Sequence, residues 1–177
     1  QVGFSLDEVL RADGVETIAW LKKNKFAPQI LSGDNAVSVE KIADQLAVNN
    51  WLYGQTPSDK IAHIHNLQAG DAKVLMVGDG LNDAPSLAAA HVSLAPASAS
   101  DVGRSAADFV FTRNSLLAVP FAKGLADKAR VLVKQNFGLA ILYNCIAVPL
   151  ALTGFVTPLF AAIAMSASSI VVVGNSL

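Results

Sequence analysis

The stretch Val77-Gly78-Asp79-Gly80-Leu81-Asn82-Asp83-Ala84-Pro85 decides the fold, and it completes the short apolar run Val74-Leu75-Met76-Val77. It places two carboxylates, an amide and two glycines in a tight turn after a predicted strand. Carboxylates four residues apart can bind a hard divalent cation through oxygen, and Mg²⁺ is the usual choice beside phosphate. Glycines let the backbone come close to a phosphate group. A bare Gly-Asp-Gly is usually an ordinary turn, but the nine-residue run predicts phosphate chemistry.

Charge is distributed unevenly along the 177 residues, of which 53% are hydrophobic. Up to residue 113 there are 13 acidic and 9 basic residues, and residues 114–134 contain 4 basic residues and 1 acidic residue. No charged residue follows Lys134. The pattern predicts a mildly acidic soluble part, a short basic collar and a membrane part. No basic patch alternates with aromatic residues, so we expect no nucleic-acid partner. A single cysteine, Cys145, allows no disulfide framework.

Helical and strand-like patterns alternate through the soluble part. The predicted helices are 14–23, 37–46, 57–67, 84–90 and 101–107, and the predicted strands are 27–31, 51–53, 73–77, 92–94 and 109–111. Such alternation predicts an α/β domain with a mostly parallel sheet covered on both faces. In sheets of this kind, ligands bind beyond the carboxyl ends of the strands.

This rule predicts that three motifs, far apart in the sequence, lie together in one candidate site. Ser32-Gly33-Asp34 ends one predicted strand, Asp79 follows another, and Lys60 lies near the start of a helix between them. Ser32 can hydrogen-bond a phosphate oxygen, Lys60 can neutralise developing negative charge, and Asp79 can bind Mg²⁺. Each motif alone is weak, because an isolated Ser-Gly-Asp is usually a loop and a single helical lysine is usually solvated. Their order and spacing together predict phosphoryl transfer.

These motifs resemble those of P-type ATPases, ion pumps built on a haloacid dehalogenase-like phosphorylation domain. That family has a Thr-Gly-Asp loop, a Pro-x-x-Lys helix and a Gly-Asp-Gly-x-Asn-Asp hinge in this order, and Ser32 stands here where Thr is commoner. The resemblance implies a partial haloacid dehalogenase-like (Rossmannoid) phosphorylation domain followed by two transmembrane helices. It implies that Asp79 and Asp83 bind Mg²⁺, that Asn82 and Asp83 support the phosphate, and that Ser32 and Lys60 act in catalysis.

The resemblance extends to the nucleotide. The segment from Phe4 to Arg11 resembles the family's Asp-x-x-Arg stretch, where the chain re-enters the phosphorylation domain. The residues implied to lie near ATP or the hinge are Asp7, Arg11, Gly33, Asp34 and Gly80.

One part of the family's chemistry is missing. An aspartyl phosphate needs a carboxylate nucleophile, which the family carries in Asp-Lys-Thr-Gly-Thr, and no such run occurs here. The chain also begins with Gln1 rather than Met and shows no signal peptide. We therefore expect a piece of a longer pump, inactive alone, whose partners are the nucleotide, actuator and upstream membrane parts of the same protein.

The uncharged segment predicts membrane helices. Its 43 residues are interrupted by Thr153-Gly154 and Pro158, which leaves two helices of about 17–20 residues, near the length that crosses a bilayer. The basic collar predicts a cytoplasmic start and an inner-membrane, multi-pass protein with a cytoplasmic soluble part. The alternative is a buried hairpin of a soluble protein. The predicted regions are 1–115 (phosphorylation domain), 116–135 (stalk helix), 136–156 and 157–177 (transmembrane helices).

Polar residues inside these helices need an explanation. Tyr143, Asn144 and Cys145 lie beside the carbonyl that Pro149 leaves without its helical donor, and Met165 and Ser169 share one face of the second helix. Intramembrane polar groups often mark a transport pathway. Spacing alone favours the alternative that they serve helix packing.

A second resemblance favours transport. Tyr-Asn followed by Pro, then Met-x-x-Ser-Ser and a final Asn-Ser-Leu, resembles the last helices of copper(I)-exporting P-type ATPases. Zinc and cadmium pumps have a charged residue there, whereas soft sulfur ligands suit Cu⁺. The resemblance implies that Tyr143, Asn144, Met165 and Ser169 bind the transported Cu⁺ and that a copper chaperone or acceptor is a candidate partner. Cys145 is a candidate extra ligand that is not part of the family's usual pattern.

The segment from Ser93 to Asp101 indicates which subgroup of copper pumps the chain resembles. It lacks the Gly-x-Gly turn of many copper pumps and resembles the bacterial pumps that deliver copper for cytochrome oxidase assembly. Two alternatives to a pump remain open from the residues. One is a membrane-anchored phosphatase of the same superfamily, and the other is a truncated, non-catalytic membrane interaction module.

Overall fold

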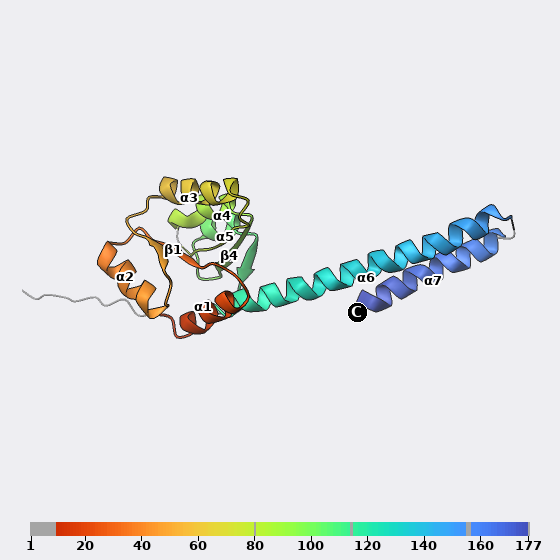
Figure 1. Ribbon diagram of the computed structural model, residues 1–177, viewed down its shortest axis with the longest axis horizontal. Helices are drawn as coiled ribbons and strands as arrows, with labels where there is room; N and C mark the ends of the chain where they lie inside the picture. Colours follow the sequence, from red (N-terminus) through yellow and green to blue (C-terminus); the bar gives the residue numbers. More distant parts are fainter. Residues whose placement is uncertain (1–9, 80, 114, 155–156, 177) are drawn as a thin grey trace, which may run out of the picture. The chain divides into compact units, whose positions relative to one another are not determined.

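The computed structural model describes residues 10–79, 81–113, 115–154 and 157–176. It divides into two compact units, residues 1–121 and 122–177. Among the described residues, the first unit contains five short α-helices and five strands, and the second contains most of one long helix and all of another (Figure 1).

The predicted elements of the first unit are confirmed in type and order. The helices are α1 (Gly14–Lys23), α2 (Ala36–Gln45), α3 (Pro57–Ala69), α4 (Ala84–Ala89) and α5 (Asp101–Ala106), and a 3-10 turn covers Leu81–Asp83. The strands are β1 (Gln29–Leu31), β2 (Asn50–Leu52), β3 (Leu75–Val77), β4 (Val92–Pro96) and β5 (Phe109–Phe111).

Two strands begin later than predicted. β1 starts after Pro28, which has no N–H for a ladder hydrogen bond. β3 starts after Val74, whose N–H donates to the ring Nδ1 of His91 at 3.2 Å instead of to a neighbouring strand. At β1 a missing N–H donor, and at β3 a side-chain acceptor, keeps the hydrogen-bond ladder from starting as early as the apolar residues predict.

All the strand pairs are parallel, as predicted, but the strands form two sheets. β1 pairs with β2, and β3 pairs with β4, which pairs with β5. Ser32 follows the carboxyl end of β1, and Asp79 follows that of β3. Two of the three candidate motifs therefore lie at strand ends, and the third, Lys60, lies in the helix Pro57–Ala69.

The core of the first unit lies under these strand ends. Its buried cluster contains Ile64, Met76, Leu87, Ala95 and Ala99. α4 packs against both α3 and α5, so the helix that follows the Asp79 turn is fixed from two sides (Figure 1).

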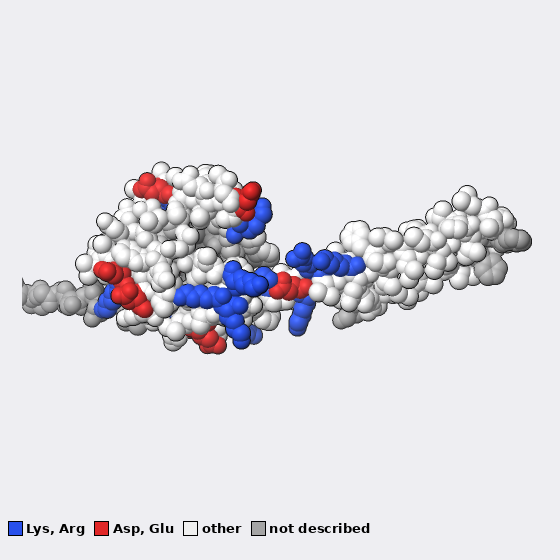
Figure 2. All heavy atoms as spheres, viewed as in Figure 1, with Lys and Arg blue, Asp and Glu red and all other residues white. Residues whose placement is uncertain are grey.

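The long helix α6 spans Ala118–Leu152 and α7 spans Pro158–Ser176. The predicted stalk and first transmembrane helix are therefore one continuous helix, with Pro149 inside its last turn. Among the described residues α6 alone is long and apolar enough to cross a membrane, while α7 contributes the shorter apolar stretch Ala161–Asn175. The second span stays a prediction. Figure 2 shows the charged atoms ending at the collar and the uncharged surface of the helices.

Within the second unit, α6 and α7 form an antiparallel hairpin. The side-chain amide of Asn175 donates to the side-chain oxygen Oδ1 of Asn136 at 2.9 Å and to Oε1 of Gln135 at 3.3 Å. These bonds join the last turn of α7 to α6 just after the collar. They therefore fix which residues of the two helices lie at the same depth.

Candidate functional site

Lys60 and Asp83 form an ion pair at the centre of the predicted site. The Nζ of Lys60 lies 2.6 Å from Oδ1 of Asp83, and the two side chains are only 10% and 16% exposed. Charges this shielded from water interact more strongly than surface pairs, and neither is stable there without the other. The structure thus brings together two predicted catalytic residues that lie 23 positions apart in the chain.

The start of α3 fixes Lys60. Thr56 accepts a hydrogen bond from the N–H of Asp59, and the Asp59 carboxylate accepts from both the N–H and the hydroxyl of Thr56. The N–H of Lys60 then donates to the Thr56 carbonyl at 3.1 Å, which is the first turn of the helix. This reciprocal cap, with Pro57 as the first helical residue, determines where Lys60 leaves the helix. The hydroxyl of Thr56 also lowers the pKa of Asp59 below its usual value.

Asp83 is fixed from the opposite side by Gly78. A Cβ on Gly78 would lie 2.9 Å from Cβ and 3.2 Å from Cγ of Asp83, closer than side chains tolerate. Only a hydrogen fits between the β3 end and the carboxylate. The sequence reasoning assigned the glycines of this run to phosphate approach and missed this contact. The position of Gly78, at a strand end directly before Asp79, is the sequence feature that could have indicated this close contact.

Asp79 and Asn82 are both exposed. Asp79 follows Gly78, whose N–H donates to the Leu94 carbonyl at 3.2 Å and so extends the β3–β4 pairing to the edge of the turn. Asn82 lies in the 3-10 turn before α4. Both polar side chains therefore face solvent at the strand end, where a ligand can reach them.

The Ser32 loop is ordered by its own hydrogen bonds. The Ser32 hydroxyl donates to Oδ2 of Asp34 at 2.5 Å, and the Asp34 N–H donates back to Ser32 Oγ at 3.2 Å. The Ser32 backbone pairs with Leu52 and Gln55, and a Cβ on Gly33 would meet the Gln55 carbonyl at 3.3 Å. No hydrogen bond or ion pair among the described residues joins Ser32 or Asp34 to Lys60. To bind a phosphate, the Ser32 hydroxyl must turn away from Asp34.

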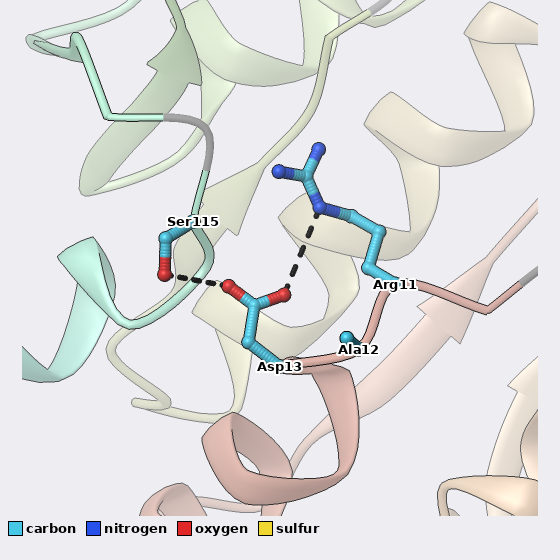
Figure 3. A pocket seen from close by; sticks show the side chains of 4 residues that line it. All are labelled: Arg11, Ala12, Asp13 and Ser115. Carbon is cyan, nitrogen blue, oxygen red and sulfur yellow. Dashed lines mark hydrogen bonds and ion pairs between the residues drawn. The ribbon is translucent and has the colours of Figure 1, made fainter.

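Of the predicted nucleotide residues, Arg11 lies in the described part and Asp7 and Gly80 lie outside it. Arg11 Nε is 3.8 Å from Oδ1 of Asp13, and the two residues line an open cleft of about 460 Å³ with Ala12 and Ser115 (Figure 3). Arg11 therefore faces a carboxylate two positions away.

Most of the predicted transport residues lie at the surface of the hairpin. Tyr143 is half-buried, whereas Asn144, Cys145, Met165 and Ser169 are exposed. Asn144 donates to the Ala140 carbonyl at 2.9 Å, and the Ser169 hydroxyl donates to the Met165 carbonyl at 3.1 Å, each within its own helix. The oxygen atoms of both side chains keep lone pairs for a further partner.

Some of these residues nevertheless lie at similar positions along the length of the hairpin. At 1.5 Å rise per residue, Asn144 lies about 12 Å along α6 from Asn136, and Ser169 and Met165 lie about 9 and 15 Å along α7 from Asn175. Because Asn136 and Asn175 are hydrogen-bonded, Asn144 falls between the other two in depth. The hairpin sets a common level for these residues but turns most of them outward.

Within the described residues no group of three or more His, Cys, Asp or Glu side chains is placed to hold a metal ion. The oxygen donors at the Asp79 turn are carboxylates, and one oxygen of Asp83 already binds Lys60. Oxygen donors of this kind fit a hard cation such as Mg²⁺ and not a soft one. Asp79 is the accessible donor.

The family follows from sequence comparison. Residues 3–91, half of the chain, match the haloacid dehalogenase-like hydrolase family, and the chain belongs to that family. Its relatives are cation-transporting P-type ATPases. The nitrogen fixation protein FixI of Rhizobium leguminosarum bv. viciae is 49% identical over 98% of this chain and 23% of its own length. The copper-exporting P-type ATPase of Mycobacterium leprae is 35% identical over 96% of this chain and 22% of its own. The chain thus spans about a quarter of these relatives.

Solved structures agree with that assignment. A zinc-transporting PIB-type ATPase in the E2.Pi state superposes with a TM-score of 0.90 and 31% identity, covering 96% of this chain and 28% of that one. The catalytic domain of the CPx-ATPase CopB-B matches 59% of this chain and 42% of that one, with a TM-score of 0.56 and 34% identity. The predicted fold class and the resemblance to heavy-metal P-type ATPases are confirmed. A zinc pump and a copper pump both match, so the cation needs a separate argument.

Proposed function

We propose that this chain is part of an ATP-driven Cu⁺ pump that works through an aspartyl phosphate whose nucleophile lies outside the chain. The observation that carries the proposal is the Lys60–Asp83 ion pair at the carboxyl ends of the strands. A shielded ammonium held by a carboxylate stays in position without reorganising as negative charge develops on a transferred phosphoryl group. Mg²⁺, when bound by Asp79, would neutralise phosphate oxygens. Asn82 and Ser32 would donate hydrogen bonds to the same group.

The division into two sheets supports a nucleophile on a missing strand. Among the described strands, β1 pairs only with β2 and β3 pairs only with β4, so one edge of each lacks a partner. Ser32 and Asp79 follow these two strands. A parallel strand inserted between β1 and β3 would join the sheets and place its own last residues between Ser32 and Asp79. That is where an attacking carboxylate must lie, and it is also where unpaired strand edges need covering.

The choice of Cu⁺ rests on the donors of the helices. No charged residue lies between Gln135 and Leu177, and the sulfur atoms there are those of Cys145 and Met165. Thioether and thiolate ligands favour Cu⁺, whereas a divalent cation in an uncharged membrane site would lack compensation for its charge. Tyr143, Asn144 and Ser169 would complete the site with residues from helices outside this chain. The copper-exporting relative supports the same cation.

The proposal also covers the cellular location and the partners of the pump. We propose that the first unit lies in the cytoplasm and that the hairpin lies in the inner membrane, and the basic collar before the uncharged helices supports this orientation. Its partners are the remaining parts of the same pump, the bilayer, and a copper chaperone or acceptor.

The test is phosphorylation of the full-length protein in membrane vesicles with ATP labelled at the γ-phosphate. We expect a phosphoenzyme that hydroxylamine destroys, because an acyl phosphate forms, and that Cu⁺ with a reductant increases more than Zn²⁺ does. Stimulation by Zn²⁺ alone would overturn the choice of Cu⁺ and keep the pump. A phosphoenzyme that forms without any metal dependence would favour a phosphatase. Absence of phosphoenzyme with an intact 18.4 kDa chain as the native product would favour an interaction module.

A further inference from the structure

Residues at the position before a helix behave in two ways in this protein. Asn35, Thr56 and Ser100 each accept a hydrogen bond from the first turn of their own helix, the usual role of a capping side chain. Asp13 and Asp83 occupy the same position before α1 and α4 but make no such bond. Their carboxylates bind donors from distant segments instead. For Asp83 that donor is the catalytic candidate Lys60, so the behaviour of Asp13 calls for a function.

The Asp13 carboxylate binds the segment that begins α6. Its Oδ2 accepts a hydrogen bond from the Ser115 hydroxyl at 2.6 Å and from the Leu116 N–H at 2.5 Å (Figure 3). These partners lie more than 100 positions along the chain, inside the same compact unit. The side chain of Asp13 is 18% exposed, so the contact is partly shielded from water.

Together Asp13 and Ser115 bind the N–H groups of the turn that leads into α6. The first N–H groups of a helix have no partner within it. Here the Leu116 N–H donates to Asp13, the Leu117 N–H donates to Ser115 Oγ at 3.2 Å, and the Ala118 N–H donates to the Ser115 carbonyl. A negative charge at this end also interacts favourably with the helix dipole. The turn that enters α6 is therefore held by a residue at the start of α1.

We propose that Asp13 is the positioning residue that couples phosphorylation to α6. The proposal rests on the proposed function, since α6 is the helix that carries Tyr143 and Asn144. Arg11, two residues before Asp13, faces the same carboxylate at 3.8 Å. A displacement of the Arg11–Asp13 segment during phosphoryl transfer would therefore be transmitted through Ser115 and Leu116 to the start of α6. Without the Asp13 carboxylate the turn that enters α6 loses a charged cap and its tie to α1.

The lowered pKa of Asp13 is consistent with this role. The Ser115 hydroxyl, the Leu116 N–H and the nearby Arg11 guanidinium all favour the ionised carboxylate and hold its pKa below the usual value, against a partial desolvation that raises it. Asp13 is therefore charged throughout the physiological pH range.

The first experiment compares variants of the intact pump in vesicles. Asp13→Ala and Ser115→Ala remove the cap, and Asp13→Asn keeps an acceptor oxygen without the charge. Asp127→Asn is the matched control, because Asp127 lies on α6, carries the same charge and pairs with Lys123 on an exposed face. We expect Asp13→Ala to reduce the Cu⁺ stimulation of phosphorylation by about fivefold or more, the usual range of coupling between sites. Phosphorylation by inorganic phosphate should stay within twofold of the wild type, with Asp13→Asn in between and Asp127→Asn unchanged.

The second experiment does not depend on pump activity. Hydrogen exchange of the full-length protein should show faster exchange at Leu116 and Leu117 in Asp13→Ala but not in Asp127→Asn. Unchanged exchange would overturn the proposal. So would Cu⁺ stimulation equal to that of the control, or a parallel loss of phosphorylation by ATP and by inorganic phosphate, which means a merely structural role. A wild-type protein without Cu⁺-dependent phosphoenzyme contradicts the proposed function, and the exchange measurement then still decides whether Asp13 caps the turn that enters α6.

Discussion

The two units differ in how far their candidate sites are assembled. In the first unit Lys60 touches Asp83, and Asp83 is packed against Gly78. In the second unit, Asn144 and Ser169 donate only to their own helices, and Met165 is 68% exposed. Each candidate set was predicted in the same way, from residue types and a family resemblance.

The geometry of the elements explains the difference. Parallel strands end at one edge of a sheet, so residues after different strands are brought together by the fold itself. A helix turns its residues outward at about 100° intervals, so neighbours such as Tyr143 and Asn144 cannot both face α7. A hairpin of two helices has one contact face. A site built on it needs further helices, while the phosphoryl site needs one further strand.

The largest effect should come from Lys60. Lys60→Ala removes the ammonium that we propose to face the phosphoryl group, and it breaks the ion pair with Asp83. We expect phosphoenzyme formation to fall by about 10²–10³-fold, as for other preorganised charge-stabilising groups. Lys73→Ala, at an exposed lysine before β3, is the control and should leave the rate unchanged. A small effect of Lys60→Ala would mean that the first unit is no better assembled than the second.

Gly78→Ala tests the close contact in the first unit. The new Cβ must displace Asp83, and a displacement of about 1 Å in a catalytic group can lower the rate by about 10²-fold. Gly124→Ala is the matched substitution in α6, where no atom lies within 4 Å of the new Cβ. Alanine in place of glycine inside a helix should stabilise that variant by about 0.5–1 kcal/mol. Phosphorylation rates and thermal midpoints of both variants check the contrast.

Met165→Ala tests whether the second unit holds transport ligands at all. We expect the Cu⁺ concentration for half-maximal phosphorylation to rise by at least about tenfold, as for residues that support metal sites. Phosphorylation by inorganic phosphate should not change. Ile163→Ala removes a comparably exposed apolar side chain from the same helix and should alter neither quantity. Equal effects of the two variants would mean that Met165 serves packing.

The pH dependence of stability tests the Asp13 cap within the first unit. Because the pKa of Asp13 is lowered in the folded protein, its contribution to stability is fully present above the unfolded pKa of about 3.9. That contribution disappears as the pH falls through the folded pKa. We expect the thermal midpoint of the wild type to exceed that of Asp13→Asn at pH 6 and the difference to shrink below pH 4. A difference that is constant down to pH 3 would contradict the ionised cap.

Asn175→Ala should have the smallest effect. Interhelical hydrogen bonds in membrane proteins contribute about 0.6 kcal/mol on average. Loss of the Asn175–Asn136 bond should therefore lower the free energy of unfolding of the hairpin by about that amount and loosen the register of α6 and α7. Disulfide formation in an Asn136→Cys/Asn175→Cys variant, compared with an Asn136→Cys/Ile170→Cys control, measures the same proximity. Equal cross-linking in both would show that the register is not fixed there.

Much of the first unit could be predicted because its signals are local. The apolar run before Gly78, the Thr56-Pro57 helix start and the alternation of helix and strand each depend on near neighbours, and the elements appear where expected within a few residues. Two strands begin later than predicted, where a single residue removes a hydrogen bond of the ladder. The His91 ring took the Val74 N–H, and Pro28 delayed β1. The predicted stalk (116–135) and first membrane helix (136–156) form one continuous helix in the structure, and their boundary at residue 135 stays a prediction.

The amino-acid sequence by itself determined the chemistry of this protein: the oxygen donors of the Asp79 turn, the uncharged helices with their sulfur atoms, and the order of motifs that marks its family. Those properties depend only on residue types and their spacing, so they can be derived from the sequence without knowledge of the fold. Only the tertiary structure decided which carboxylates act where. Asp13 and Asp83 both precede helices and should cap them by residue type. Folding brings stronger donors, Ser115 with Leu116 and Lys60, within hydrogen-bond distance of the two carboxylates, and long-range contacts of this kind cannot be inferred from near neighbours.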